Sequence, residues 1–185
     1  MQRELGITFV HVTHTQLEAI ALADIVVVME KGKIKQSGAA RDVYAHPRDR
    51  YVAEFLGGQN VLSGKVEKVG EDHLVISQPN RSGIQVGVRP NASVEVGDRI
   101  DLAVRRDDIE LMRAGAGGLE DGATALPSRV VAIEYQGSFV KVMLDTIPDE
   151  EFVAYIPERI FFRDPFNIGD VLLATWSAGR ARVLA

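Results

Sequence analysis

The sequence of 185 residues contains no cysteine, which excludes disulfide bonds, thiol catalysis and cysteine-based metal sites. The absence fits a reducing compartment without proving one. Long hydrophobic runs are missing as well, because Asp24 and Glu30 interrupt the most apolar region. We therefore expect no membrane-spanning helix and no signal peptide, so that any membrane association must go through a partner protein.

The sequence also lacks an excess of positive charge, since its formal net charge is −5. Residues 1–57 carry seven basic and seven acidic side chains, whereas residues 58–185 carry fourteen basic and nineteen acidic ones. An acidic second half argues against nonspecific binding to nucleic acid or anionic membranes. Hydrophobic residues make up 46% of the chain, enough for a sizeable core in one or two domains.

The stretch 7–34 predicts a strand, a polar turn, a helix, a strand, a tight turn and a last strand. Residues 7–13 are rich in β-branched side chains, as strands are. Thr13 or Thr15 can accept a hydrogen bond from the first N–H groups of the Ala- and Leu-rich helix that follows. His14 stands at the end of the first strand, where a parallel sheet positions its ligand-binding groups.

Residues 25–57 predict two further strands and two short helices. Residues 25–30 form an apolar run without polar alternation, which is typical of a strand buried on both faces. Lys31-Gly32 predicts a turn, and residues 33–38 predict a polar-alternating edge strand. Residues 41–57 predict two short helices separated by Pro47, the second with an apolar face and a terminal glycine pair.

This pattern resembles the end of an ABC-transporter ATPase domain, in the importer subclass for sugars, polyamines, sulfate or iron. The ATPase subunits of that subclass carry a C-terminal TOBE domain. One departure is visible, because the family usually has Asp where Thr15 stands. The matching residues are Val12-Thr13-His14, Gln16, Glu18-Ala19, Leu22-Ala23-Asp24, Val28-Met29, Gly32-Lys33-Ile34, Gln36, Gly38, Val43-Tyr44, Pro47, Val52-Ala53, Phe55-Leu56-Gly57 and Asn60.

The resemblance implies ATP and Mg²⁺ as cofactors of the full-length subunit, and His14 as the catalytic residue that contacts the γ-phosphate of ATP. It also implies a second copy of the subunit and transporter membrane subunits as partners, at the cytoplasmic face of the plasma membrane. The P-loop, the signature motif and the catalytic carboxylate have no match here. Gly64-Lys65 lacks the first glycine of a P-loop, and Leu62-Ser63-Gly64 follows the histidine instead of preceding it as the signature motif does. We expect this chain alone to bind no cofactor and to be inactive as an ATPase.

No metal site is expected. His11 and His14 are three residues apart, and on a strand an odd spacing directs two side chains to opposite faces. No third ligand lies nearby in the sequence.

The best domain boundary is Gly57-Gly58-Gln59-Asn60. Residues 1–57 then form the C-terminal fragment of an ABC nucleotide-binding domain, and residues 58–185 form a TOBE domain. The predicted fold class is mainly β with a small α/β N-terminal piece, in which an OB-like barrel follows the last strands and helices of a P-loop ATPase domain. Residues 113–127 are rich in Gly and Ala and predict a mobile loop or linker.

An internal repeat runs through the second half. Gly97 and Gly169 each stand in an apolar-Gly-Asp motif, 72 residues apart. Lys65-Val66 and Arg129-Val130 each begin a strand, 64 residues apart. Two such half-repeats predict one closed β unit with two similar lobes.

Two further groups have alternative interpretations. The charged run 105–108 reads as an exposed polar turn, or as a contact that docks the barrel onto a partner ATPase subunit; Arg106 stands where the family usually has proline. The second group is aromatic and predicts core or interface packing rather than base stacking, because no lysines are interleaved with it. It comprises Phe152, Tyr155, Phe161, Phe162 and Phe166.

Three functions stay open at this point. The first is the C-terminal part of an importer ATPase subunit, with a regulatory or docking barrel. The second is a stand-alone module that binds a small ligand or a protein without ATPase activity, and the third is a nucleic-acid-binding OB protein. If residues 1–57 are severed from a larger sheet, we expect two copies to pair through them, and the exchange of strands is one way to do so.

Overall fold

The computed structural model describes residues 6–79, 81–88, 94–113, 123–147 and 150–184. The chain divides into two compact units, Met1–Gly57 and Gly58–Ala185. Each unit has its own hydrophobic cluster. The two units are described separately below.

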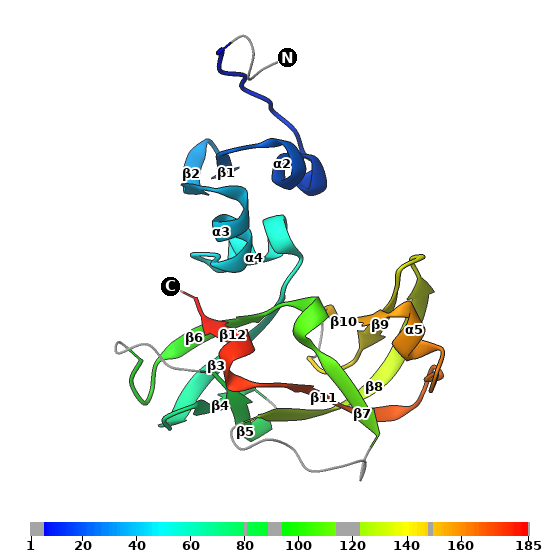
Figure 1. Cartoon of the computed structure of the whole chain (residues 1–185). Coiled ribbons are helices and arrows are strands. Elements are labelled where there is room, and N and C mark those ends of the chain that lie inside the picture. The colour runs from blue at the N-terminus through cyan, green and yellow to red at the C-terminus, as the bar shows by residue number, and fades with distance from the viewer. Residues whose placement is uncertain (1–5, 80, 89–93, 114–122, 148–149, 185) are drawn as a thin grey trace. The chain divides into compact units, whose positions relative to one another are not determined.

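The N-terminal unit pairs a two-stranded antiparallel hairpin with three short helices (Figure 1). Its elements are α2 (Gln16–Leu22), β1 (Val26–Glu30), β2 (Lys33–Gly38), α3 (Ala40–Ala45) and α4 (Arg50–Gly57). The hairpin turns at Lys31 and Gly32, whose φ angles of 49° and 77° are both left-handed. Two positive φ angles are what a two-residue hairpin turn requires, so the predicted turn is confirmed.

Side chains from the hairpin and the helices form the core of this unit. Val26 and Val28 of β1 are buried against Val43 of α3 and against Val52 and Leu56 of α4. The carboxylate of Asp49 accepts a hydrogen bond from the Val52 N–H at 3.0 Å and so closes the first turn of α4. Helix α4 therefore has a buried apolar face, in which Val52 and Ala53 are fully buried and Leu56 nearly so, whereas Phe55 is 37% exposed.

Two local predictions for the N-terminal unit are wrong. Residues 7–13 have no strand partner among the described residues, because β1 bonds only to β2. Strand β1 is buried on one face only, since Val27 is 49% and Met29 is 52% exposed. Both differences have one cause. A strand needs neighbouring strands for its hydrogen bonds and packed elements to bury its faces. The described residues of this unit provide no such neighbour for residues 7–13 and no cover for the outer face of β1.

The predicted cap of α2 also differs. Thr15 is the N-cap residue but its side chain makes no capping hydrogen bond. The Thr13 hydroxyl instead accepts from the Thr15 N–H at 2.9 Å and donates to the Glu18 carboxylate at 2.8 Å. The threonine pair thus stabilises the turn before the helix rather than the free N–H groups within it.

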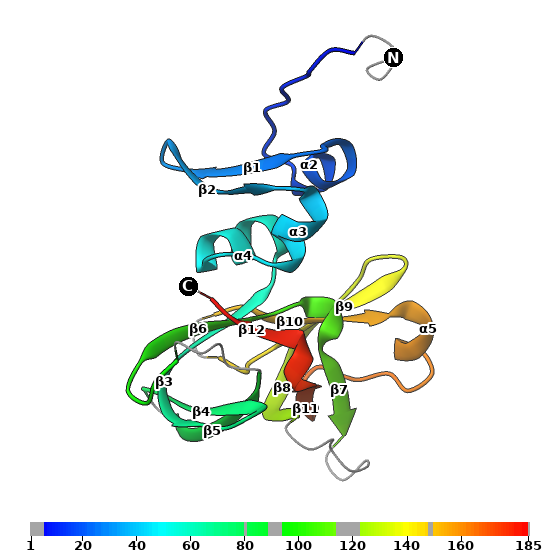
Figure 2. The same cartoon turned by 60° about the vertical axis from the view of Figure 1, so that its left-hand side comes forward.

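The C-terminal unit consists of two five-stranded antiparallel sheets (Figures 1 and 2). The strand orders are β12-β6-β3-β4-β5, here called lobe 1, and β10-β9-β8-β11-β7, here called lobe 2. The strands are β3 (Asn60–Val69), β4 (His73–Gln78), β5 (Arg81–Gly87), β6 (Arg99–Val104), β7 (Glu110–Arg113), β8 (Thr124–Tyr135), β9 (Phe139–Leu144), β10 (Phe152–Pro157), β11 (Val171–Trp176) and β12 (Ala181–Val183). Three short helical segments connect them, namely η1 (Arg106–Asp108), α5 (Glu158–Phe161) and η2 (Ala178–Arg180).

The two lobes exchange their last strands. Strand β7 follows β6 in the chain but pairs with β11 in lobe 2, whereas β12 follows β11 and pairs with β6 in lobe 1. The registers are equivalent, because Leu102 lies opposite Val183 just as Ala174 lies opposite Leu111. Each lobe therefore completes its sheet with a strand from the other half of the sequence.

The predicted internal repeat is confirmed by matching backbone hydrogen bonds. The Val66 N–H donates to the carbonyl of Asp98 at 2.8 Å, and the Gly97 N–H donates back to the Val66 carbonyl at 2.8 Å. In lobe 2, Val130 forms the same pair of bonds with Asp170 and Gly169, at 2.9 Å and 2.8 Å. Gly97 and Gly169 have φ angles of 101° and 96°, which explains glycine at both motifs.

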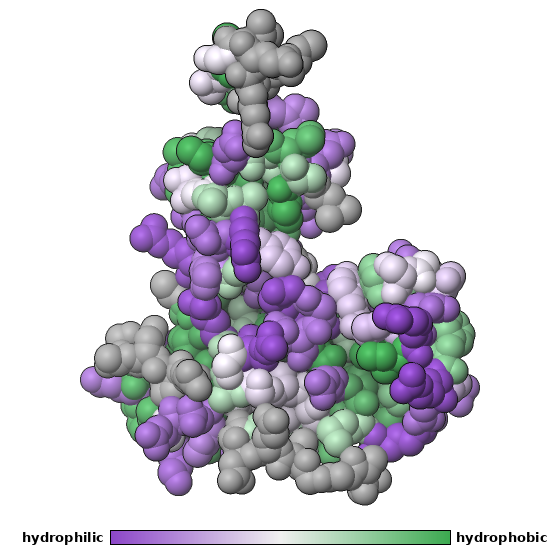
Figure 3. All heavy atoms as spheres, in the orientation of Figure 1, coloured by the Kyte–Doolittle hydropathy of each residue, from purple (hydrophilic) through white to green (hydrophobic). Residues whose placement is uncertain are grey.

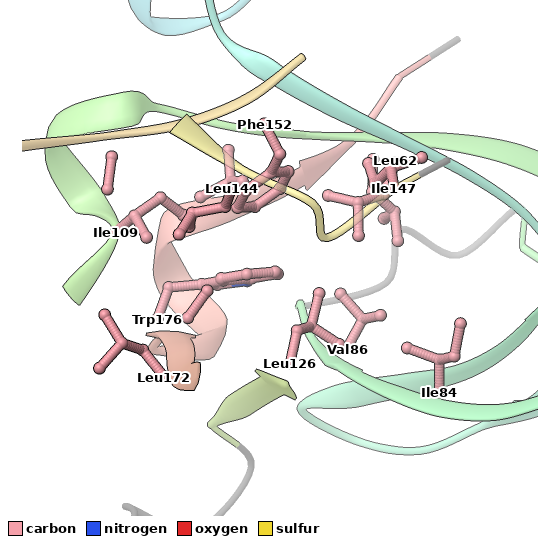
Figure 4. Packing of buried hydrophobic residues seen from close by; sticks show 14 of the residues in the cluster. Leu62, Ile84, Val86, Ile109, Leu126, Leu144, Ile147, Phe152, Leu172 and Trp176 are labelled. Carbon is pink, nitrogen blue, oxygen red and sulfur yellow. The ribbon is translucent and has the colours of Figure 1, made fainter. Parts of the chain in front are cut away.

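One core fills the space between the sheets. Its buried side chains come from both lobes, for example Leu62 and Val86 from lobe 1 and Phe152 and Trp176 from lobe 2 (Figure 4). The rings of Phe152 and Trp176 lie 6.2 Å apart. Because each half of the repeat buries its apolar face against the other, neither half retains this core alone.

Buried polar side chains fasten the outermost strand of each lobe to the other lobe. The Asn60 side chain on β3 donates to the Val153 carbonyl at 2.7 Å and accepts from the Val153 N–H at 2.8 Å. At the repeat-related position, the Thr124 hydroxyl accepts from the Gly87 N–H at 2.6 Å, and the Trp176 indole donates to the Gly87 carbonyl at 3.2 Å. These contacts satisfy backbone groups that a sheet edge would otherwise leave unpaired inside the core.

The structure thus confirms a mainly β fold of OB-like type with a small α/β N-terminal piece. Its two sheets are open in the described residues and do not close into a single ring, which differs from the expected closed unit. The expected linker over residues 113–127 is also too long, because Arg113 belongs to β7 and Thr124–Pro127 belong to β8. Residues 114–122 lie outside the described residues.

We expect Asn60→Ala to lower the free energy of unfolding by about 2–4 kcal/mol, because it leaves the buried N–H and carbonyl of Val153 without partners. Chemical denaturation followed by circular dichroism measures the change. Asn167→Ala, at an exposed turn, is the matched control and should change the stability by less than about 0.5 kcal/mol. Equal effects of the two substitutions would contradict the role given to Asn60.

Candidate functional site

The candidate catalytic residue His14 lies at an exposed bend just before α2. Its side chain has no hydrogen-bond or ion-pair partner within the part of the chain that the structure describes. Its neighbours are tied together: Thr13 bonds to Glu18, and the His11 Nε2 lies 3.7 Å from the same Glu18 carboxylate. Local bonds therefore hold the turn, while the His14 imidazole remains free to meet a group from outside.

A hollow of about 710 Å³ lies beside this bend. Residues 9–16, helix α2, strand β1 and the end of α4 line it. Its walls include Phe9 and Val12, which are 62% and 91% exposed. Apolar residues also reach the surface of the N-terminal unit elsewhere (Figure 3). Apolar surface of this extent marks a face that is built to be covered.

The charged run 105–108 is more than an exposed turn. Arg106 is largely buried; its Nη1 donates to the Tyr155 hydroxyl at 3.1 Å, and its guanidinium lies 5.7 Å from the centre of that ring. A second nitrogen, Nη2, lies 3.4 Å from the Glu151 carboxylate. These contacts hold η1 against strand β10.

The other members of the run form ion pairs within the same unit. Arg105 pairs with Asp107 and Asp108, and Asp108 also lies 3.1 Å from the guanidinium of Arg180 on η2. Asp108 and Arg180 occupy equivalent positions of the repeat, so this ion pair joins the two halves where they meet. Burial raises the pKa of Asp108, although the two arginines oppose the shift.

A second group of charged side chains surrounds Glu151, and the sequence did not reveal it. Lys141 on β9 bonds to the Glu151 carboxylate at 2.8 Å and lies 3.8 Å from Glu134. The Lys141 hydrogen bond lowers the pKa of Glu151, and the charge of Arg106 adds to the effect against the opposing effect of burial. Glu134, Lys141 and Glu151 lie on or next to the adjacent strands β8, β9 and β10, and the pairing of these strands brings them together.

The aromatic residues predicted to pack in the core or at an interface form four ring contacts. Phe161 stacks edge-on with Phe162 at 5.3 Å and with Phe166 at 6.0 Å. Phe152 packs against the buried indole in the core, and Tyr155 contacts Phe139 at 4.6 Å. None of these arrangements forms an open stacking platform within the described residues, which agrees with a packing role.

No cluster of three or more His, Asp or Glu side chains among the described residues has the arrangement of a metal site. None of the described helices is long and apolar enough to cross a membrane.

Comparison with known proteins agrees with this geometry. Residues 102–184 match the TOBE domain family. A solved structure of the cytoplasmic molybdate-binding protein ModG superposes with a TM-score of 0.57 and 17% identity, over 68% of this chain and 95% of that one. At this identity, the likeness supports the fold alone.

The curated relatives are spermidine/putrescine import ATP-binding proteins named PotA. The protein of Frankia alni is 29% identical over 100% of this chain and 40% of its own length. That of Pseudomonas fluorescens is 28% identical over 100% of this chain and 47% of its own length, and that of Legionella pneumophila is 34% identical over 78% and 38%. The chain thus spans less than half the length of these relatives.

Residues 102–184 are similar to the TOBE domain family, and the two-lobed β fold of the C-terminal unit agrees with that match. The chain as a whole is similar to the C-terminal part of the ATP-binding subunit of an ABC importer, which confirms the resemblance found in the sequence.

The ion cluster around Glu151 predicts a pH dependence. A carboxylate whose pKa is lowered in the folded state contributes stability above its ordinary pKa and loses it as the pH falls through the folded value. We expect Glu151→Gln to cost less than about 1 kcal/mol at pH 7, because the group is half exposed, and to flatten the loss of stability below about pH 5. Urea denaturation across this pH range measures both effects.

Glu110→Gln is the control for that experiment. The Glu110 side chain is exposed and has no basic partner among the described residues. Its substitution should leave the acid limb of the stability curve unchanged. If Glu151→Gln and Glu110→Gln give the same curve, the ion cluster does not stabilise the folded state.

Proposed function

We propose that this chain is the C-terminal part of an ATP-binding subunit that drives solute uptake through an ABC importer. The observation that carries the proposal is the similarity to PotA proteins along the whole chain. In the full-length subunit, ATP and Mg²⁺ would bind to the part of the nucleotide-binding domain that is absent from this sequence. His14 senses the γ-phosphate, and residues 58–185 have a regulatory or docking role. The relatives are named as spermidine/putrescine import proteins, and these names suggest a polyamine as the transported substrate.

The chemistry of His14 supports this role. An imidazole N–H can donate to a phosphate oxygen, and the hydrogen bond strengthens as charge develops on the transferred group. The exposed position of His14 leaves it accessible to a nucleotide bound by other parts of the subunit. Phosphoryl transfer also needs a phosphate cradle, a metal site and a positioned water, which lie outside this chain.

Reading the DNA upstream of Met1 identifies the full-length subunit. The first test of this proposal is the substitution His14→Ala in that subunit. We expect ATP hydrolysis to fall by about 100-fold or more while ATP binding changes little, because the lost contact acts mainly on the transition state. His46→Ala is the control and should leave hydrolysis unchanged. Hydrolysis at the original rate in the His14 variant, or the absence of an upstream P-loop, would sink the proposal.

The apolar face of the N-terminal unit supports a second copy of the chain as a partner. Residues 7–13 lie extended and unpaired, with Phe9 and Val12 largely exposed, as a strand that awaits a neighbour would. Pairing of two copies through residues 1–57 buries this surface. The membrane subunits are proposed as further partners in the cell.

Light scattering tests the pairing directly on this chain. We expect a dimer, and we expect the double substitution Phe9→Asp and Val12→Asp to weaken association at least tenfold by placing charge on the contact surface. Val96→Asp, at an exposed apolar residue of the C-terminal unit, is the control and should leave the dimer intact. A monodisperse monomer of the unmodified chain refutes the pairing.

One observation favours a second function, a stand-alone module that binds a small ligand. The ModG structure with the same fold is described as binding molybdate. An upstream P-loop and signature motif in the same reading frame would decide for the importer subunit, and a true start at Met1 would decide for the module. The affinity of this chain for ATP is a second criterion. A micromolar dissociation constant for ATP, measured by calorimetry on this chain alone, would contradict both proposed functions.

A further inference from the structure

The C-terminal unit begins at Gly58, and its first three residues are packed into it. Gly58 is partly buried and has a left-handed φ angle of 50°. Gln59 and Asn60 are 7% and 1% exposed, and the Asn60 side chain bonds to both backbone groups of Val153. The segment 58–60 is therefore a packed part of the unit, although glycine and polar residues at a domain boundary usually indicate a free linker.

The guanidinium of Arg106 covers Gly58 directly. A Cβ atom at position 58 would lie 3.2 Å from the Arg106 Nη1 and 3.4 Å from its Cζ, which is closer than most Cβ contacts in proteins. A residue with a side chain would also be strained at this positive φ angle. Gly58 therefore leaves the room that Arg106 occupies, and the two residues fit as a pair.

Two side chains on or next to β10 hold the guanidinium in this place. Nη1 donates to the Tyr155 hydroxyl at 3.1 Å, and Nη2 lies 3.4 Å from the Glu151 carboxylate. Glu151 is itself held by Lys141 at 2.8 Å. A planar guanidinium with two anchors keeps one orientation, so it presents a fixed surface to Gly58.

The remaining nitrogen of the guanidinium shows that hydrogen bonds alone do not decide its position. The Arg106 Nε–H is buried and has no acceptor among the described residues. A buried donor without an acceptor is unfavourable, whereas water would solvate the same N–H at the surface. Packing has to offset this cost, and Gly58 supplies part of it, because a Cβ atom at position 58 would lie 3.8 Å from Nε.

The internal repeat supplies an independent comparison. The segments η1 and η2 begin 72 residues apart, the same spacing as the two glycine motifs, so Arg106 corresponds to Ala178. Because η2 forms with alanine at this position, the turn itself does not require an arginine. The arginine stands in the half of the repeat that follows the domain boundary, where it contacts Gly58.

We propose that Arg106 fixes the joint between the two units of the chain. By holding Gly58 against the C-terminal unit, it confines bending of the chain to residues that precede Gly58. Without this contact, the flexible joint extends through Gln59 to the bonds of Asn60. The inference uses residues of the C-terminal unit alone and does not depend on the proposed importer function.

Backbone amide relaxation, measured by NMR on the 185-residue chain, tests the proposal. We expect the Gly58 and Gln59 amides to have the order parameters of a rigid backbone, about 0.85, and to fall below about 0.6 in Arg106→Ala. Arg182→Ala, at an exposed arginine of β12, is the matched control and should leave both values unchanged. A flexible Gly58 in the unmodified chain, or a rigid Gly58 in the Arg106 variant, would overturn the proposal.

Tyr155→Phe is a milder variant, because it removes the hydroxyl anchor and keeps the ring in the sheet. We expect hydrogen exchange of the Gln59 amide to become about threefold faster or more, while exchange within β4 stays the same. Tyr135→Phe, at an exposed tyrosine of β8, should change neither rate. Equal acceleration at Gln59 and in β4 would show a general loss of stability and would refute a local role of the anchor.

The absence of cysteine allows a second measurement on the same chain. Spin labels attached through Arg41→Cys and Lys68→Cys, one exposed position in each unit, report the spread of distances between the units. Dilution with unlabelled chain removes the contribution of pairs of copies. We expect Arg106→Ala to widen the distance distribution about 1.5-fold or more, because the flexible segment becomes longer. An unchanged width would contradict the position given to the joint.

Discussion

The exchange of β7 and β12 between the two sheets is the constraint on which the C-terminal unit depends. Each sheet ends in a strand from the other half of the repeat, so neither half can complete its hydrogen bonds or bury its apolar face alone. The side chains of Asn60 and Thr124 add to this by bonding to the backbone of the opposite lobe. The unit should therefore fold as one cooperative body rather than as two lobes.

The two halves keep the same backbone and differ in the chemistry of their surfaces. Equivalent valines, glycines and aspartates make the same backbone hydrogen bonds in both lobes. Their surface charges differ, because lobe 2 has Asp145 at the position that Ser77 occupies in lobe 1. The shared core carries the stability of both halves, so their surface positions can differ without loss of the common backbone.

The N-terminal unit differs, because it forms only a small core and leaves several apolar side chains exposed. Its helices and hairpin bury a small core around Val43 and Val52. Strand β1 nevertheless leaves Val27 and Met29 exposed, and residues 7–13 have no strand partner among the described residues. A sheet that is meant to be covered on both faces explains these features, and it agrees with the similarity to the end of a larger ATP-binding subunit.

Features that depend on neighbours in the sequence were predictable here. The hairpin turn at Lys31-Gly32 and the glycines of the repeat follow from local backbone preferences and from the spacing of apolar residues. The sequence also identified His14 as a candidate, through family resemblance rather than geometry. Residues 7–13 failed as a strand because a strand forms only with a partner, which local sequence cannot supply.

By itself, then, the amino-acid sequence determined the fold class, the repeat and the family resemblance, because turn residues and apolar spacing act over a few positions. Only the tertiary structure decided that the lobes exchange strands, that Arg106 joins η1 to β10, and that its guanidinium covers Gly58. Each of these depends on the register between strands that are distant in the chain. The hydrophobic pattern of one strand selects the face that it buries, but the packing of the whole core decides which distant strand it pairs with.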